Sequence, residues 1–316
     1  MIFFKNIDKQ YKQHFAVRSV TLRVLKKERL VFLGGSGSGK TTLLKMVLRL
    51  IDPTHGTIFI EGQDYRTMDL ITLRRRVGYA IQNTGLFHHM TVFENIAVVL
   101  RLLGSSEEAI QTRVGDLLCM VGLDPGTFGQ KYPHQLSGGQ GQRVGVARAF
   151  AHRPEIILMD EPFGGLDPIT RNQLQDECID LQTKLDTTMI FVTHDVHEAV
   201  KIGDRIALFK EGELQQIGTP QEVICNPQNP FVEDFFSHQR FQLFLTMKKL
   251  SAMPLESGSP QHMQVGINRS LLQLLNDFSQ KGVDVISVYK KEQFLGNIHK
   301  QTVLRELETL IQEGYG

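Results

Sequence analysis

The chain has few cysteines and almost no net charge. Its three cysteines, Cys119, Cys178 and Cys225, lie far apart. They fit neither a disulfide framework nor the close spacing of a zinc site, so a reducing compartment is expected. The 35 basic and 34 acidic side chains leave a formal charge of +1. Composition therefore gives no support for a nucleic acid or an anionic membrane surface as a direct partner.

Long apolar runs are lacking as well. The longest apolar patch, IAVVLRLLG, is interrupted by Arg101 and is too short to span a bilayer. The N-terminal stretch MIFFKNIDKQYKQ begins apolar but shows no cleavable signal pattern. We therefore expect a soluble chain that needs another, membrane-spanning chain for any work at a membrane. Its 316 residues, 41% of them apolar, are enough for about two domains with ample core.

The pattern of apolar residues divides the chain into an α/β core with a helical insert and a smaller C-terminal unit. Alternation in residues 2–7 and 16–24 predicts antiparallel strands. Continuous apolar runs in RLVFLGG, EIILMDEP and TMIFVTHD, separated by helix-like stretches, predict a parallel sheet wrapped by helices. Residues 86–151 have a helical pattern. We expect one domain over residues 1–236, and over residues 237–316 a linker and a small helix–strand–strand–helix unit.

The stretch GGSGSGKTT, Gly34 to Thr42, follows a buried strand and precedes a helix, and it fits the pattern G-x-x-x-x-G-K-[ST]. In that context the backbone amides at the helix start can surround a phosphate. Lys40 can reach the outer phosphates, and the Thr41 hydroxyl can bind magnesium. The predicted phosphate-binding residues are Gly34, Gly35, Ser36, Gly37, Ser38, Gly39, Lys40, Thr41 and Thr42.

Three further side chains are expected at the same edge of the sheet, because parallel strands gather their ligands at their carboxyl ends. Asp160 ends the strand IILMD, where it can hold magnesium. Glu161 follows directly and points the other way, so that one carboxylate can serve the metal and the other can polarise water. His194 ends the next buried strand. Gln82 follows a short strand at the start of the helical insert, and by itself it predicts only a loop residue.

The stretch LSGGQGQR presents a second glycine-rich helix start. Ser137 and Gln140 fit a capping box, S-x-x-Q. The box does not explain Gly138 and Gly139, each of which costs about 1 kcal/mol relative to alanine inside a helix. Paired glycines at a helix start suit the close approach of an anion. This second anion site holds either a second nucleotide or the nucleotide of a partner chain.

Together these motifs resemble the ATP-binding subunit of ABC transporters over residues 1–236, with GLD at residues 165–167 as a further match. The stretches VGYAIQNTGLFHHMTVFENIA, YPHQLSGGQGQRVGVARA and IILMDEPFGGLDPITRNQLQDE resemble the glycine betaine, carnitine and choline importers of bacteria. The implied fold is a P-loop ATPase of ABC type, α/β, with a mixed sheet core, an antiparallel β subdomain and a helical subdomain.

The resemblance also implies a role for each matching residue. Two copies stack head to tail around two ATP molecules. Each ATP is held by the Gly34–Thr42 loop of one chain and by the Ser137–Gln140 turn of the other, which we call the signature turn. Glu161 is then the general base, His194 contacts the γ-phosphate, and Thr41, Gln82 and Asp160 support Mg²⁺, with Gln82 also coupling the site to the membrane subunit. Tyr11 matches the aromatic residue that stacks on adenine. The residues implied to complete the partner's site are Ser137, Gly138, Gly139, Gln140 and Asp167.

Three departures from the family pattern are visible, and none removes a catalytic group. Gly141 stands where glutamine is usual, which loosens the first turn of the signature helix. Gly165 replaces a commoner alanine or serine, and Lys27 and Arg29 flank Glu28 where a glycine–glutamate turn is usual. We therefore expect an active ATPase.

The C-terminal unit, notably DVISVYKKEQFLGNIHKQTVLREL, resembles a single CBS domain, which would pair between chains. His299 and Thr302 occupy the places where threonine and aspartate typically hold an adenosine ribose, so nucleotide binding by this unit is not expected. Dimer stabilisation and sensing both stay open as its role.

The implied partners are a second copy of the chain, transmembrane permease subunits and, indirectly, an extracytoplasmic substrate-binding protein, without nucleic acid. The implied location is the cytoplasmic face of the bacterial inner membrane. Two alternatives stay open. One is an importer of another cargo, namely an amino acid, a polyamine or a phospholipid. The other is a soluble ABC-type ATPase of DNA repair or translation, against which the lack of a coiled-coil tract and of a second phosphate loop argues.

Overall fold

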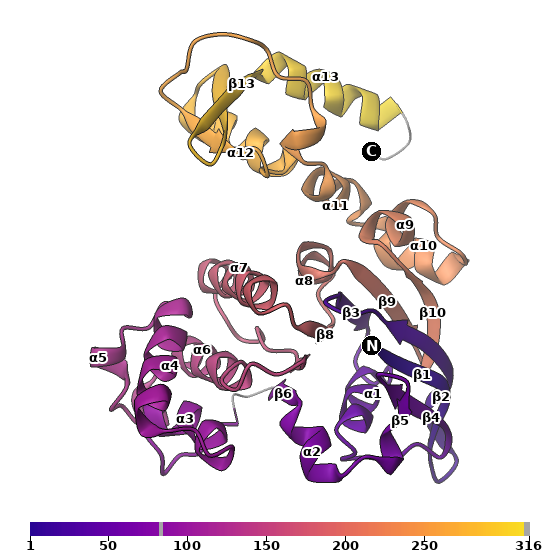
Figure 1. Ribbon diagram of the computed structural model, residues 1–316. Helices are drawn as coiled ribbons and strands as arrows, with labels where there is room; N and C mark the ends of the chain where they lie inside the picture. The colour runs from indigo at the N-terminus through magenta and orange to yellow at the C-terminus, as the bar shows by residue number, and fades with distance from the viewer. Residues whose placement is uncertain (82–84, 313–316) are drawn as a thin grey trace. The chain divides into compact units, whose positions relative to one another are not determined.

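A computed structural model of the chain describes residues 1–81 and 85–312 (Figure 1). The chain divides into two compact units, Met1–Thr219 and Pro220–Gly316. This division falls earlier than the expected domain boundary at residue 236, because the helix α9 (Pro220–Cys225) packs on α10 (Pro230–Ser237) and α11 (Arg240–Met247).

The alternating N-terminal pattern forms an antiparallel sheet. Its strands, in the order β2-β1-β4-β5, are β1 (Ile2–Tyr11), β2 (His14–Val24), β4 (His55–Ile60) and β5 (Gln63–Asp64), followed by the 3₁₀ turn η1 (Tyr65–Thr67). The inward side chains of β1, such as Phe4 and Ile7, are fully buried. They share one core with apolar residues of the helix α1 (Lys40–Val47), so the sheet supports the start of the phosphate loop's helix.

The turn that follows β2 forms without the glycine that is usual in the family that the sequence resembles. Lys27 adopts φ 64°, a left-handed conformation that glycine would take at less cost. Glu28 is buried, and its carboxylate accepts a hydrogen bond from the backbone N–H of Leu25 and pairs with Arg205 at 3.1 Å. The partly buried ion pair therefore holds the turn in place despite the departure in sequence.

The second sheet carries the predicted buried strands. Its strands, in the order β10-β9-β3-β8-β7-β6, are β3 (Arg29–Gly34), β6 (Val77–Ala80), β7 (Ile156–Asp160), β8 (Thr188–Thr193), β9 (Arg205–Lys210) and β10 (Glu213–Gly218). All of them run parallel except β10, which is antiparallel to β9. Leu33 pairs with Thr193, and Asp160 pairs with Val192. This register brings the carboxyl ends of β3, β7 and β8 to one edge, as predicted.

Helices flank this sheet and form the predicted insert. The helices that flank the sheet are α1, α2 (Leu70–Arg75), α7 (Pro168–Leu185) and α8 (Val196–Ile202). Those of the insert are α3 (Val92–Leu102), α4 (Glu107–Met120), α5 (Pro125–Phe128), η2 (Pro133–Gln135) and α6 (Gly138–Ala149), which gather in one cluster in Figure 1. Arg143 of α6 pairs with Glu177 of α7 at 2.8 Å and donates to the Val121 carbonyl. This contact joins the insert to the α/β core.

The second unit contains the predicted helix–strand–strand–helix pattern. Its further elements are η3 (Leu250–Ala252), β11 (Gln264–Gly266), α12 (Leu271–Lys281), β12 (Val285–Lys290), β13 (Gln293–His299) and α13 (Lys300–Leu310). The strands lie in the order β11-β12-β13, and apolar side chains of α12, α13 and the sheet share a core. The short strand β11 has no counterpart in the sequence prediction. Over the described residues, no helix of either unit is long and apolar enough to cross a membrane.

Candidate active site

The phosphate loop surrounds its own lysine. Gly39, the N-cap of α1, has φ 92°, and a side chain there would meet the Ala16 carbonyl, so only glycine fits. The Lys40 ammonium donates to the carbonyls of Gly34 (2.9 Å) and Gly35 (2.7 Å) and to the Ser38 hydroxyl (3.1 Å). Lys40 is thus folded into the loop, at the start of α1.

Burial lowers the pKa of Lys40, and the negative charges of Glu161 and Asp160 oppose this shift. The lysine therefore sits in a desolvated position next to two carboxylates, where an incoming anion would gain strongly from its charge. Of the other predicted loop residues, Ser36 and Gly37 are exposed, and Thr42 is half-buried.

Thr41 and Asp160 meet at the carboxyl end of β7. The Thr41 hydroxyl donates to Asp160 Oδ1 at 2.8 Å. Burial raises the pKa of Asp160, while the hydrogen bond from Thr41 lowers it. A hydroxyl and a carboxylate are oxygen ligands of the kind that Mg²⁺ prefers. The donor set therefore fits the predicted magnesium site. Gln82, the third predicted member, lies outside the described residues.

Glu161 and His194 face each other across the same edge. His194 Nδ1 lies 3.3 Å from Glu161 Oε1, and the His194 side chain is 66% exposed. Glu161 has φ 46°, a left-handed conformation that is uncommon outside glycine, and its backbone N–H donates to the Val192 carbonyl at 3.0 Å. The turned backbone directs Glu161 and Asp160 differently, as the sequence suggested.

The signature turn forms the predicted capping box. The Ser137 hydroxyl accepts from the Gln140 N–H at 3.3 Å, and the Gln140 side chain accepts from the Ser137 N–H at 3.0 Å. Gly141 donates to the Ser137 carbonyl at 2.9 Å, so this departure leaves the first helical turn hydrogen-bonded. Ser137 and Gly138 are both exposed.

The two signature glycines differ in their surroundings. Apart from its chain neighbours and the backbone of its own helix, a Cβ atom on Gly138 would meet no described atom within 4 Å, whereas one on Gly139 would lie 3.2 Å from Leu166 and 3.4 Å from Thr170. Gly139 therefore has a packing reason within this chain. Only Gly138 lacks an explanation within the described part of the chain.

Asp167 and Tyr11 have simple local roles in the single chain. Asp167 caps α7 by accepting from the N–H groups of Ile169 and Thr170. The hydrogen bond from the Thr170 side chain, followed by the backbone one from Thr170, lowers the pKa of Asp167. Gly165 has φ 78°, which glycine adopts more readily than the alanine or serine usual there. Tyr11 ends β1, is 48% exposed, and has the Lys9 ammonium 5.0 Å from its ring centroid.

Comparisons with known proteins agree with this geometry. The ABC transporter family model matches residues 17–164. The glycine betaine/carnitine/choline transport ATP-binding protein OpuCA of Bacillus subtilis (strain 168) is 44% identical over 297 residues, covering 93% of this chain and 77% of that protein. This chain belongs to the ABC transporter ATP-binding proteins. The glycine betaine uptake system ATP-binding protein YehX of Escherichia coli (strain K12) is 38% identical over 308 residues, covering 97% of this chain and 100% of that protein.

Solved ABC cassettes share the fold of this ATP-binding subunit. A dimeric structure of MJ0796, a bacterial ABC transporter cassette, has a TM-score of 0.65 and 34% identity and covers 70% of this chain and 99% of its own. The dimeric post-hydrolysis state of the MJ0796 cassette bound to ADP and Pi has a TM-score of 0.64 and 32% identity, with the same coverage. The predicted ABC-type fold is therefore confirmed, and the subunit is an ABC-type ATPase.

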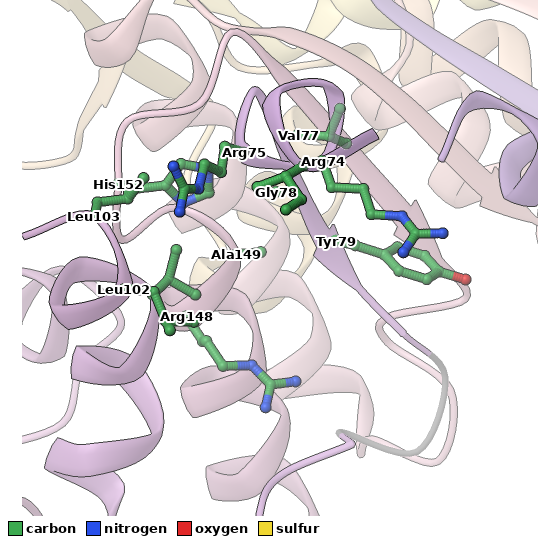
Figure 2. A pocket seen from close by; sticks show the side chains of 12 residues that line it. Arg74, Arg75, Val77, Gly78, Tyr79, Leu102, Leu103, Arg148, Ala149 and His152 are labelled. Carbon is green, nitrogen blue, oxygen red and sulfur yellow. The ribbon is translucent and has the colours of Figure 1, made fainter. Parts of the chain in front are cut away.

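The ATP-binding subunit also has an apolar groove that the sequence did not predict. The groove has a volume of about 400 Å³ and lies among α2, β6, α3 and α6. Figure 2 shows Leu102 and Arg148 on one side and Arg74 and Tyr79 on the other. Leu102 and Ile71 at its rim are 69% and 61% exposed. Burial raises the pKa of Tyr79, and the charge of Asp160 at the predicted magnesium site raises it further.

Proposed function

We propose that this ATPase drives the import of glycine betaine, choline or carnitine-type osmoprotectants into a bacterial cell. Relatives whose names specify transport of these compounds align with most of the chain. The choline transport ATP-binding protein OpuBA of Bacillus subtilis is 42% identical and covers 93% of this chain. The sulfate/thiosulfate import ATP-binding protein CysA of Bacillus cereus is 41% identical but covers 84%. The cargo class therefore rests on the relatives' names and identities rather than on coverage, since the osmoprotectant import ATP-binding protein OsmV of Salmonella typhimurium, at 46% identity, covers 79% of this chain.

In this proposal, ATP binds at the Gly34–Thr42 loop and Tyr11 stacks on its adenine. Lys40 leaves the carbonyls of Gly34 and Gly35 to pair with the outer phosphates. Thr41, Asp160 and Gln82 hold Mg²⁺, which neutralises phosphate charge and orients the oxygens when bound. Catalysis rests on positioning and charge stabilisation rather than on a covalent intermediate.

Glu161 is the proposed general base. Its carboxylate accepts a proton from the attacking water, and His194 beside it contacts the γ-phosphate. The single observation that carries this assignment is the 3.3 Å contact between Glu161 and His194, at the same sheet edge as the 2.8 Å contact between Thr41 and Asp160. Two carboxylates with separate neighbours allow one to hold the metal ion while the other takes the proton.

The second copy completes each site in this proposal. The residues assigned to the partner's ATP are Ser137, Gly138, Gly139, Gln140 and Asp167. Two observations favour a surface that a partner covers: the open space beside Gly138, and the apolar side chain of Ile169, which is 72% exposed next to Asp167. The dimeric MJ0796 structures supply the precedent.

The permease subunit is proposed to dock in the groove beside Tyr79, with Gln82 coupling it to the ATP site. In this proposal the ATP-binding chain is peripheral, at the cytoplasmic face of the inner membrane. A substrate-binding protein acts on it indirectly, through the permease. Residues 237–316 are proposed to be a CBS-like unit that pairs with its copy and stabilises the dimer.

Transport by a reconstituted complex tests the proposal. The chain is expressed with the permease and binding protein encoded beside its gene, and the complex is placed in proteoliposomes. We expect ATP-dependent uptake of labelled glycine betaine, choline or carnitine, and none with Glu161→Gln. Uptake of sulfate or a polyamine instead would refute the cargo. Failure to copurify with any polytopic chain would refute transport.

A further inference from the structure

Arg171, in the first turn of α7, contacts two segments that are far apart in the sequence. Its Nη2 donates to the Leu166 carbonyl at 3.1 Å, in the turn that holds Gly165 and Asp167. Its Nη1 donates to Asp195 Oδ2 at 3.4 Å, and its Nε lies 3.9 Å from Glu198 Oε1. One planar guanidinium thus joins a backbone carbonyl of the turn 164–167 to two carboxylates of the 193–198 segment.

The carboxylate of Glu198 is buried and hydrogen-bonded on both of its oxygens. Glu198 is 7% exposed. Its Oε2 accepts from the Thr193 hydroxyl at 2.7 Å, and its Oε1 accepts from Gln175 Nε2 at 3.4 Å. Burial raises the pKa of Glu198, while the charge of Arg171 favours its ionised form. Arg171 is therefore a counter-charge for this buried carboxylate.

The residues on both sides of His194 belong to the same cluster. The Asp195 N–H donates to the Thr193 hydroxyl at 3.0 Å, and Asp195 Oδ1 caps α8 by accepting from the N–H groups of His197 and Glu198. The His194 side chain is largely exposed, with its one short polar contact in the described residues to Glu161. Its backbone position is consequently set by Thr193 and Asp195.

We propose that Arg171 is a positioning residue that couples the turn 164–167 to His194. On the other side, this turn contacts the signature helix: Leu166 lies against Gly139, and Gln142 donates to the Gly164 carbonyl at 2.7 Å. Arg171 therefore links the surface assigned to the partner's site with the histidine of its own site. This inference rests on the shared-site dimer proposed above.

Lysine cannot replace this arginine. Arginine presents five donors in a fixed plane, so it donates to the Leu166 carbonyl and to Asp195 together while its charge stays within ion-pair distance of Glu198, whereas lysine is a single flexible point charge. In Arg171→Lys we expect kcat to fall roughly 10- to 100-fold, as for a misplaced catalytic group. The KM for ATP should change little, because Arg171 makes no contact with the phosphate loop in the described structure.

Lys201→Met is the matched control. Lys201 also joins α7 and α8, through Asp176 at 2.8 Å and the Asn172 carbonyl at 3.0 Å, but it contacts neither the turn 164–167 nor residues 193–195 among the described contacts. Asp195→Asn is the second test variant. Asparagine caps a helix as well as aspartate does but removes the charge that faces Arg171.

Three measurements test the inference. The first is steady-state ATPase activity. The second is amide hydrogen exchange of residues 193–198 in the nucleotide-free chain, which should accelerate in Arg171→Lys and Asp195→Asn and stay unchanged in Lys201→Met. The third is ATP-induced dimerisation in a Glu161→Gln background, where Arg171→Lys should weaken the dimer.

The outcomes distinguish a failure of the Arg171 inference from a failure of the proposed shared-site dimer. If Glu161→Gln alone does not dimerise with ATP, the shared site fails and the inference fails with it. If Glu161→Gln dimerises, but Arg171→Lys keeps normal kcat and normal exchange, the inference alone is overturned. Equal effects in Lys201→Met would show that Arg171 only stabilises the packing of α7 against α8. That result would also overturn the inference.

Discussion

At the residue scale, Gly138 is a residue of low helix propensity with open space where a side chain would lie. Glycine costs a helix up to about 1 kcal/mol relative to alanine. Gly139 is explained by its contact with Leu166 and Thr170, but no described atom lies within 4 Å of the position that a Gly138 side chain would take. The stability of the single chain therefore gives no reason for glycine at 138, whereas the proposed contact with the partner's phosphates would give one.

Gly138→Ala should accordingly separate stability from activity. We expect the free energy of unfolding to rise by up to about 1 kcal/mol. ATPase activity should fall at least about tenfold, because in the proposed dimer the added methyl group would face the partner's phosphate. Denaturant unfolding and steady-state ATPase assays measure the two effects.

Gly115→Ala is the matched control for this substitution. Gly115 lies within α4, and a Cβ atom there would also meet no described atom within 4 Å. It should raise stability in the same way and leave ATPase activity unchanged. Normal activity in Gly138→Ala would contradict the assignment of this glycine to the shared site.

At the scale of elements, residues 255–263 cross the sheet of the second unit and are held by a buried polar pair. Ser287 and Asn297 are 0% and 5% exposed, and the Ser287 hydroxyl donates to Asn297 Oδ1 at 2.7 Å. The same hydroxyl accepts from the Gln261 N–H at 2.6 Å, and Asn297 Nδ2 donates to the Ser259 carbonyl at 3.1 Å. These hydrogen bonds satisfy polar groups that would otherwise be costly to bury.

Gly296 makes the close approach of the segment 255–263 feasible. It has φ 148°, and a Cβ atom there would lie 2.9 Å from the Glu256 carbonyl oxygen. Asn297 and Glu256 also exchange two backbone hydrogen bonds, at 2.8 and 2.9 Å. Glu256 thus forms an isolated antiparallel β-bridge with Asn297 at the β13 edge, and this pairing depends on a glycine and an asparagine in adjacent positions.

Asn297→Ala should loosen this segment. The substitution leaves the Ser287 hydroxyl and the Ser259 carbonyl without their side-chain partner, at a cost of about 1–3 kcal/mol. We expect faster amide hydrogen exchange in residues 255–263. Gln293→Ala, at the exposed start of the same strand, should leave the exchange unchanged. Equal protection in both variants would show that backbone pairing alone holds the segment.

The sequence predicted the elements with strong local signals and missed contacts between distant segments. The apolar runs of β3, β7 and β8 located the site edge, and the S-x-x-Q spacing predicted the capping box at Ser137. The packing reason for Gly139 was not visible, because Leu166 and Thr170 come close only through tertiary contact. Arg171 was missed for the same reason, since its partners come from a turn and from the segment around His194. The groove beside Tyr79 likewise forms only when α2 and β6 pack near α3 and α6.

At the scale of the whole molecule, the central claim is that one ATP site is built from two chains. Lys40, Thr41, Asp160, Glu161 and His194 gather at one sheet edge. The signature turn Ser137–Gln140 instead makes its described contacts within α6 and, beside Gly139, with Leu166 and Thr170. Under the proposed function, a head-to-tail copy of the chain supplies the second set of phosphate contacts.

Mixing two inactive variants tests this claim most directly. Lys40→Ala removes the phosphate lysine and keeps the signature turn, whereas Ser137→Arg blocks the signature turn and keeps the lysine. Each variant alone should be inactive. An equimolar mixture should recover about one quarter of the wild-type ATPase rate, because half of the dimers are then mixed and each mixed dimer has one intact site out of two. A mixture that stays as inactive as its components, while mixed dimers are shown to form, would contradict the shared site.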